Sequence, residues 1–194
     1  MDDPIIAVIE KLAIVWNSMT REAGKEYGLS PLQIHILEYC GRDQQRQPGV
    51  TSIALEVGVT KPTISKALDT LVRRGIVLRS VLAKDKRRQF VELSPTGEQL
   101  LEHLTGWKAT VEEQLSSFSD HLRKQTFGFL LKLIDSLQQA GLIRPGDVCL
   151  ACRYLSKDRR EENGTLYHCK LLARPIADSE LVVECKEYSR RNLG

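Results

Sequence analysis

Residues 51–94 read TSIALEVGVTKPTISKALDTLVRRGIVLRSVLAKDKRRQFVELS. The apolar spacing predicts a short helix that Thr51 caps and Gly58 ends, then a tight turn and a second helix that Thr60 caps. Two runs with strand character, IVLRSV and RQFVELS, follow around the turn LAKDKR. This order of elements is typical of a winged helix-turn-helix that binds double-stranded DNA.

Positive charge is concentrated in this stretch. From residue 61 to residue 88 the chain has nine cationic side chains and two acidic ones, Asp69 and Asp85, although its net charge is only +3. An ordinary solvated face is the alternative, but cations gathered on a DNA-reading unit indicate phosphate binding. The nine cations are Lys61, Lys66, Arg73, Arg74, Arg79, Lys84, Lys86, Arg87 and Arg88.

Individual DNA contacts follow from the position of each residue. The N-terminal part of a recognition helix faces base edges in the major groove, while Ile64 and Leu68 should point inward and hold the helix in place. Arg87 of the wing is predicted to enter the minor groove, where A·T-rich DNA concentrates negative potential. The residues expected at base edges or backbone are Thr60, Lys61, Pro62, Thr63, Ser65 and Lys66. The phosphate candidates are Arg73, Arg74, Lys84 and Arg88.

Helical periodicity extends on both sides of this stretch. Residues 3–28 predict an amphipathic helix that stops at Gly28, and Ser30-Pro31-Leu32-Gln33 predicts a capping box at the start of the next helix. A helix is predicted from Ser94-Pro95 to about residue 118, and a last long helix from residue 119 to Gly141.

Residues 5–141 resemble the MarR family of winged-helix regulators. The similarity rests on KPTISKALDTLVRRGIV in the recognition helix and on KDKRRQFVELSPTGEQLL in the wing and the helix after it. The family's wing usually has Asp-Arg-Arg, a strand and Leu-Thr-x-x-Gly. Asp85 and Arg87 match this pattern, whereas Lys86 and Ser94 depart from it mildly. The resemblance implies that Asp85 fixes the wing by pairing with an arginine.

The resemblance also implies a fold and partners. The fold class is mainly α with a small β-wing and a helical dimerisation domain, followed here by a small cysteine-rich α+β or β module. The long helices would interlock in a homodimer that binds an inverted repeat, and family members usually hold a small-molecule effector between the DNA-binding domain and these helices. A helical core within a single chain is the alternative.

Four of the five cysteines lie near the C-terminus with the pattern C-x2-C-x16-C-x15-C. Four thiolates suit tetrahedral zinc, the preferred cofactor, or an iron–sulfur cluster, and a metal-free thiol switch also remains open. His168 is a substitute ligand, although adjacent strand residues point to opposite faces. Cys40 lies on an apolar helix face and is expected to pack in the core. The predicted ligands are Cys149, Cys152, Cys169 and Cys185.

Other function classes are disfavoured. The sequence has no Ser-His-Asp arrangement, glycine-rich phosphate loop or HExxH motif, so an enzyme is not expected, and Cys169 next to His168 is poor geometry for a catalytic pair. No apolar stretch approaches membrane-spanning length and no secretory signal is visible, which favours a cytoplasmic protein.

The predicted organisation has four parts. These are an N-terminal dimerisation helix (1–30), a winged helix-turn-helix (31–94), C-terminal dimerisation helices (95–143) and a four-cysteine metal-binding module (144–194). The leading hypothesis is a sequence-specific transcriptional regulator, most simply a repressor, whose cysteine module is structural or senses metal or redox state. The competing hypothesis is a metal-bearing protein-interaction module on a helical dimer with little specific DNA binding.

Overall fold

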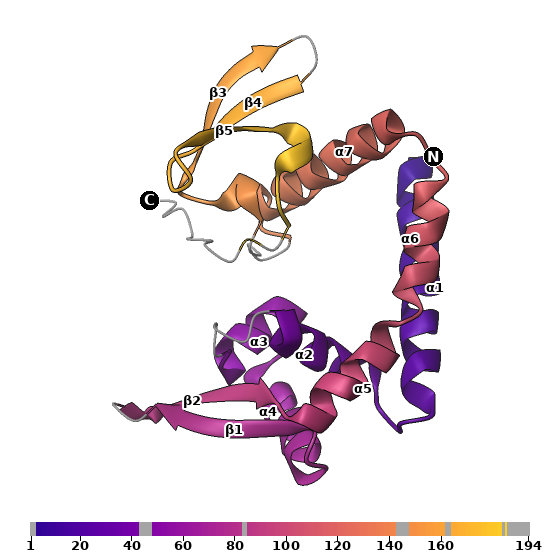
Figure 1. Ribbon diagram of the computed structural model, residues 1–194, viewed down its shortest axis with the longest axis vertical. Coiled ribbons are helices and arrows are strands. Elements are labelled where there is room, and N and C mark those ends of the chain that lie inside the picture. The colour runs from indigo at the N-terminus through magenta and orange to yellow at the C-terminus, as the bar shows by residue number, and fades with distance from the viewer. Residues whose placement is uncertain are drawn as a thin grey trace. The chain divides into compact units, whose positions relative to one another are not determined.

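Helices and short strands follow one another in the order that Figure 1 shows. The structure, a computed structural model, describes residues 3–42, 48–82, 85–142, 148–161, 164–183 and 185. The chain divides into two units, residues 1–113 and 114–194, and each unit has its own hydrophobic core.

The first unit has a winged helix-turn-helix at its centre. Its elements are α1 (Pro4–Lys25), α2 (Pro31–Arg42), α3 (Val50–Val57), α4 (Lys61–Arg73), β1 (Val77–Leu82), β2 (Asp85–Leu93), α5 (Pro95–Thr105) and most of α6 (Lys108–Ser116). β1 and β2 form the antiparallel hairpin that Figure 1 shows, and Val77 lies opposite Leu93. Ile64 and Leu68 of α4 are fully buried, as predicted, and so is Leu71; each contributes about 1.5–3 kcal/mol by its burial.

Local hydrogen bonds set the helix ends that the sequence predicts. The capping box at the start of α2 is confirmed, because Gln33 Oε1 accepts from the backbone N–H of Ser30 at 2.9 Å and Ser30 Oγ accepts from that of Gln33 at 3.3 Å. Thr60 Oγ1 accepts from the N–H of Thr63 and so caps α4. The prediction that Thr51 caps α3 is wrong, because the capping position is Gly49, two residues earlier, and its N–H donates to Ser52 Oγ.

The helix predicted from Ser94 to about residue 118 is interrupted. α5 ends at Thr105 and α6 begins at Lys108. Thr105 Oγ1 donates to the carbonyl oxygen of Leu101 at 2.8 Å, and such bonds back to the preceding turn bend helices. Trp107, which the periodicity places on a helical stripe, instead lies in the break and packs edge-on against Trp16 with ring centroids 4.7 Å apart.

The second unit combines a helix with a small sheet. It contains α7 (Asp120–Gln139), the 3-10 turns η2 (Cys149–Ala151) and η3 (Asp178–Glu180), and the antiparallel sheet β3 (Leu155–Glu161), β4 (Gly164–Cys169) and β5 (Arg174–Ala177) in the order β3-β4-β5. Its core joins α7 to the cysteine-rich segment. The buried members are Leu131, Val148, Cys149, Cys152, Leu155, Tyr167, Ile176 and Leu181.

Periodicity predicts this sheet only in part. Strand-like composition predicts strands in the runs TLYHCKLL and SELVVEC. The first prediction is confirmed by β4, but the second is wrong, because η3 and irregular chain occupy residues 178–183. Glu180 Oε2 accepts from the N–H of Ala177, and this contact stabilises the turn in place of a strand. β3 is rich in charged residues and β5 begins Arg174-Pro175, so neither has the apolar alternation that marks a strand.

Candidate nucleic-acid interface

The turn between α3 and α4 presents the N-terminal end of α4 to solvent. Gly58 ends α3 with φ 73°, a left-handed conformation that glycine adopts without strain, and Thr60 then caps α4. Ile53 and Ile64 are fully buried on either side of the turn. These anchors fix the angle between the two helices and leave the first turn of α4 outside the core.

The residues predicted to read DNA gather on this exposed end. Ser65 is half-buried, and the Oγ1 atoms of Thr60 and Thr63 lie 2.8 Å apart. Thr63 and Lys66 are three residues apart and therefore share a helix face. Hydroxyl and ammonium groups on one face can donate to base edges and to phosphates. The exposed residues are Thr60, Lys61, Pro62, Thr63 and Lys66.

Near the tip of the wing, the structure describes the backbone but not the side chains. Asp85, Arg87 and Arg88 belong to β2. The register of the hairpin shifts between Val81 and Leu82, next to the tip. The side chains of residues 81–89, and Lys84 altogether, lie outside the described residues, so the pairing expected for Asp85 stays a prediction.

Several arginines of the basic stretch contact the protein itself. Arg79 Nη2 of β1 lies 2.8 Å from Asp69 Oδ1 of α4. Arg73 donates through Nε to the Asp69 carbonyl oxygen and through Nη2 to Thr70 Oγ1, both on its own helix. The sequence does not reveal these partners, because every cation in the stretch has the same formal charge.

Arg74 has a structural role that sequence reasoning missed. Its Nη2 donates to the carbonyl oxygen of Tyr27 at 2.7 Å and its Nη1 to that of Gly28 at 3.3 Å. These contacts join the end of the recognition helix to the connection between α1 and α2. A guanidinium engaged with two carbonyls has fewer donors to offer to a phosphate.

A second set of contacts joins α1, α2 and α6. Lys108 Nζ lies 2.6 Å from Glu38 Oε1 and also lies 5.6 Å and 5.9 Å from the ring centroids of Trp16 and Trp107. Partial burial opposes ionisation of Glu38, but hydrogen bonds from His35 and Lys108 outweigh it and lower the pKa of the carboxyl. The paired charges thus fasten α2, which supports the helix-turn-helix, to two neighbouring helices.

Ser94 stands where the family's Leu-Thr-x-x-Gly pattern has threonine, and its hydroxyl joins the wing to α5. Its Oγ donates to the Gly75 carbonyl oxygen at 2.7 Å and accepts from the N–H of Gly97 at 3.0 Å. A hydroxyl is all that these bonds require, so serine can replace threonine. Gly97 is needed at its position because a Cβ there would collide with the carbonyl oxygen of Ile76.

The predicted metal ligands all belong to the core of the second unit. Cys149 and Cys152 are buried, and Cys169 and Cys185 are half-buried and pack against the same cluster. Burial raises the pKa of the Cys149 thiol, the nearby thiols of Cys185, Cys152 and Cys169 raise it further, and a hydrogen bond from the Val182 N–H lowers it. Among the described residues, no group of three or more Cys, His, Asp or Glu side chains is arranged so as to hold a metal ion.

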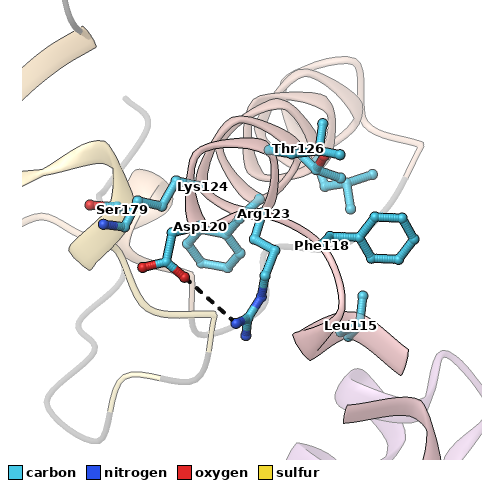
Figure 2. A pocket seen from close by; sticks show the side chains of 10 residues that line it. Leu115, Phe118, Asp120, Arg123, Lys124, Thr126 and Ser179 are labelled. Atoms are coloured by element: carbon cyan, nitrogen blue, oxygen red, sulfur yellow. Dashed lines mark ion pairs between the residues drawn. The ribbon is translucent and has the colours of Figure 1, made fainter. Parts of the chain in front are cut away.

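An apolar pocket of about 700 Å³ lies at the start of α7 in the second unit. Figure 2 shows Asp120 and Arg123 paired at its edge, with their charged atoms 3.9 Å apart. The lining is otherwise mainly apolar, and Phe118 and Leu115 come from the end of α6 and the residues after it. Leu122 and Leu130 are 47% and 43% exposed, so this face of α7 leaves apolar surface open to solvent.

Comparisons with known proteins agree with this geometry. A family profile described as MarR family matches residues 27–88. The chain is 30% identical over 116 residues to the HTH-type transcriptional repressor YetL of Bacillus subtilis (strain 168), covering 59% of this chain and 68% of YetL. It is 28% identical over 116 residues to an uncharacterized HTH-type transcriptional regulator, YhjH, of the same organism, covering 60% of this chain and 65% of YhjH. The chain therefore spans slightly less than two thirds of YhjH.

Solved structures show the same fold. The S. aureus MepR–DNA complex matches with a TM-score of 0.60 and 26% identity over 71% of this chain and 100% of MepR. MepR in its DNA-binding conformation matches with a TM-score of 0.62 and 27% identity over 69% of this chain and 98% of MepR.

A helix-turn-helix with an adjacent hairpin and an exposed polar and basic recognition surface defines a winged-helix DNA-binding protein. The chain belongs to the MarR family, and the relatives that it matches are HTH-type transcriptional regulators. Within the described part of the chain, no helix combines the length and the apolar character needed to cross a membrane.

Proposed function

We propose that this protein represses transcription as a homodimer that binds an inverted-repeat operator through α4 and the wing. The observation that carries the proposal is the exposed N-terminal end of α4, where Lys61, Thr63 and Lys66 surround a buried anchor, Ile64. Bases are read from this end, while Lys84, Arg87 and Arg88 of the wing supply minor-groove and phosphate contacts.

The homodimer is supported by apolar surface that one chain leaves exposed. Large apolar side chains on α1 are 39–64% exposed, and Phe129 of α7 is 48% exposed. A second copy would bury these faces, because a two-fold dimer applies the same surface on both subunits. Its two recognition helices would then meet half-sites about one helical turn apart. The exposed α1 residues are Ile5, Ile6, Val8, Ile9, Leu12, Ile14, Val15 and Trp16.

Two further parts of the proposal concern regulation. A small-molecule effector is proposed from the family resemblance, with a site between the DNA-binding domain and the dimerisation helices. The C-terminal cysteines are proposed to bind a metal, zinc or an iron–sulfur cluster, that stabilises the second unit or makes DNA binding respond to metal or redox state.

Selection of bound duplexes from a random pool tests the DNA-binding function. We expect an inverted repeat to emerge, and we expect Lys66→Ala to change the selected bases. Lys25→Ala is the control, because Lys25 is a solvent-exposed cation of α1.

Arg87→Ala should weaken binding and reduce the magnitude of the slope of log K against log salt by about 0.9. Enrichment of no sequence, with salt-insensitive affinity, would favour the protein-interaction module instead.

A further inference from the structure

The fold brings four cysteines from three separate segments onto one small core. Cys149 begins η2 and Cys152 follows it, and the N–H of Cys152 donates to the carbonyl oxygen of Cys149 at 2.9 Å and closes a tight turn. Cys169 ends β4 opposite Leu155 of β3. The N–H of Lys170 donates to the Tyr154 carbonyl oxygen at 2.8 Å, so the chain after Cys169 is held beside the chain after Cys152.

The fourth cysteine reaches the same place through a pair of reciprocal hydrogen bonds. The N–H of Cys149 donates to the Val182 carbonyl oxygen at 3.0 Å, and the N–H of Val182 donates to Cys149 Sγ at 3.4 Å. Val182 is three residues before Cys185, which packs on the same core.

From this placement we infer that Cys149, Cys152, Cys169 and Cys185 are the four ligands of one divalent zinc ion. The inference deepens the metal-binding part of the proposed function and rests on it only for the regulatory consequence. The described thiols are gathered but not closed around a common point. Zinc would draw them together as each thiol releases its proton, because the binding of a metal and the folding of its site are coupled.

A single zinc ion suits this core better than the alternatives. It binds four thiolates at about 2.3 Å and needs less room than an iron–sulfur cluster. Cys149 and Cys152 are only 7% and 6% exposed and pack among apolar side chains of the core. All five cysteines are free thiols in the structure. His168 is excluded as a ligand because it precedes Cys169 on β4 and faces the other side of the sheet.

Zinc at this position would also act on α7. Leu131 of α7 is 1% exposed in the cysteine core, and Phe127 and Ile134 pack against it. The ion would fix residues 182–185 to the turn at 149–152, and this turn covers one face of α7. Loss of zinc should therefore loosen the helix that the proposed dimer uses.

Metal analysis of the full-length protein tests the site without reference to DNA. We expect about one zinc ion per chain after dialysis. Protein stripped with a chelator should bind one equivalent of Co²⁺ and show the visible absorption of a tetrahedral thiolate site. Zinc should also slow hydrogen exchange at the amides of Cys149 and Val182. Protein that binds neither ion, or that contains iron and sulfide with its own visible band, or in which the four thiols are oxidised to disulfides, would overturn the inference.

Variants separate ligation from folding. Each of Cys149→Ser, Cys152→Ser, Cys169→Ser and Cys185→Ser should reduce zinc content to near zero. Cys40→Ala and His168→Ala should keep the zinc content of the parent, and equal loss in these controls would show adventitious binding. Where a serine variant fails to fold, the Co²⁺ titration of the stripped parent protein still tests whether the four thiols bind one metal ion. DNA binding is measured separately, so a protein that binds zinc but no operator would contradict only the repressor proposal.

Discussion

Asp69 of the recognition helix pairs with Arg79 of the first wing strand, with Oδ1 and Nη2 2.8 Å apart. Arg79 Nη2 also lies 3.5 Å from the carbonyl oxygen of Ser65, one turn earlier on α4. The pair joins the two elements that the proposed complex places on DNA, the helix in the major groove and the hairpin beside it. It also neutralises one cation of the basic stretch, which lowers non-specific attraction to phosphate.

Asp69→Asn should therefore tighten non-specific DNA binding and reduce discrimination between operator and random sequence. The released guanidinium can contact a phosphate, so the slope of log K against log salt should steepen by up to about 0.9. Fluorescence anisotropy across a salt series measures both quantities. Glu102→Gln makes the same charge change at an exposed position of α5 and is the control. An unchanged slope in Asp69→Asn would mean that Arg79 stays away from DNA.

Arg74→Ala should lower stability more than it lowers DNA affinity. The change removes two charged hydrogen bonds to the carbonyls of Tyr27 and Gly28, and we expect a loss of about 1.5–3 kcal/mol in the free energy of unfolding. Arg73→Ala is the matched comparison, because Arg73 bonds only to its own helix among its described contacts. Urea denaturation separates the two variants. Equal small losses would show that the contacts of Arg74 contribute little.

Short-range rules account for much of the first unit. The capping box at Ser30 and the buried face of α4 depend on residues three or four positions apart, so periodicity and capping chemistry predict them. The partners of Arg74 lie more than forty residues away along the chain, and no local pattern encodes them. The clustering of nine cations indicates a DNA surface, but it does not show which cations the protein uses internally.

The second unit is harder to predict from the sequence, because residues far apart in the chain determine its fold. Its strands are short and rich in charge, and their pairing depends on a core built from cysteines. The spacing of Cys149, Cys152, Cys169 and Cys185 predicts a common site, and the fold does gather them. The break at Gly106 could not be predicted from the apolar stripe, because the stripe continues on both sides of it. The Trp16–Trp107 contact at the break joins residues far apart in the chain, and no local pattern encodes it.

Gly97→Ala should destabilise the junction between the wing and α5. The new Cβ would collide with the Ile76 carbonyl oxygen, and because backbone cannot easily move away we expect a loss of about 1–3 kcal/mol. Gly106→Ala is the control, since its φ is −55° and its Cβ would meet nothing closer than the His103 carbonyl oxygen at 3.5 Å. That variant should be neutral or more stable by about 0.4–1 kcal/mol. Thermal unfolding measures the melting temperatures of both variants. Equal melting temperatures would contradict the close approach of residue 97 to the Ile76 carbonyl oxygen.

The pair between Glu38 and Lys108 should make stability depend on pH in one direction. The side chain of Glu38 is 13% exposed, and hydrogen bonds from His35 and Lys108 lower its pKa against the effect of burial. Glu38→Gln should therefore cost about 1.5–3 kcal/mol at neutral pH, because the ammonium of Lys108 loses a charged partner. The wild-type advantage should be fully present above the ordinary carboxyl pKa of 4.5 and should disappear as the pH falls through the lowered value.

Denaturant titrations of both proteins between neutral and acidic pH measure this difference. Glu56→Gln is the control, because the side chains of Glu56 and its partner Arg42 are 28% and 36% exposed, and solvent screens such a pair. It should cost less than about 1 kcal/mol. A wild-type advantage over Glu38→Gln that persists unchanged into acid would show that packing against Trp16 and Trp107, and not the charge of Glu38, holds Lys108 in place. A gap that closes in acid would instead identify the ionised carboxylate as the group that fastens α2 to α6.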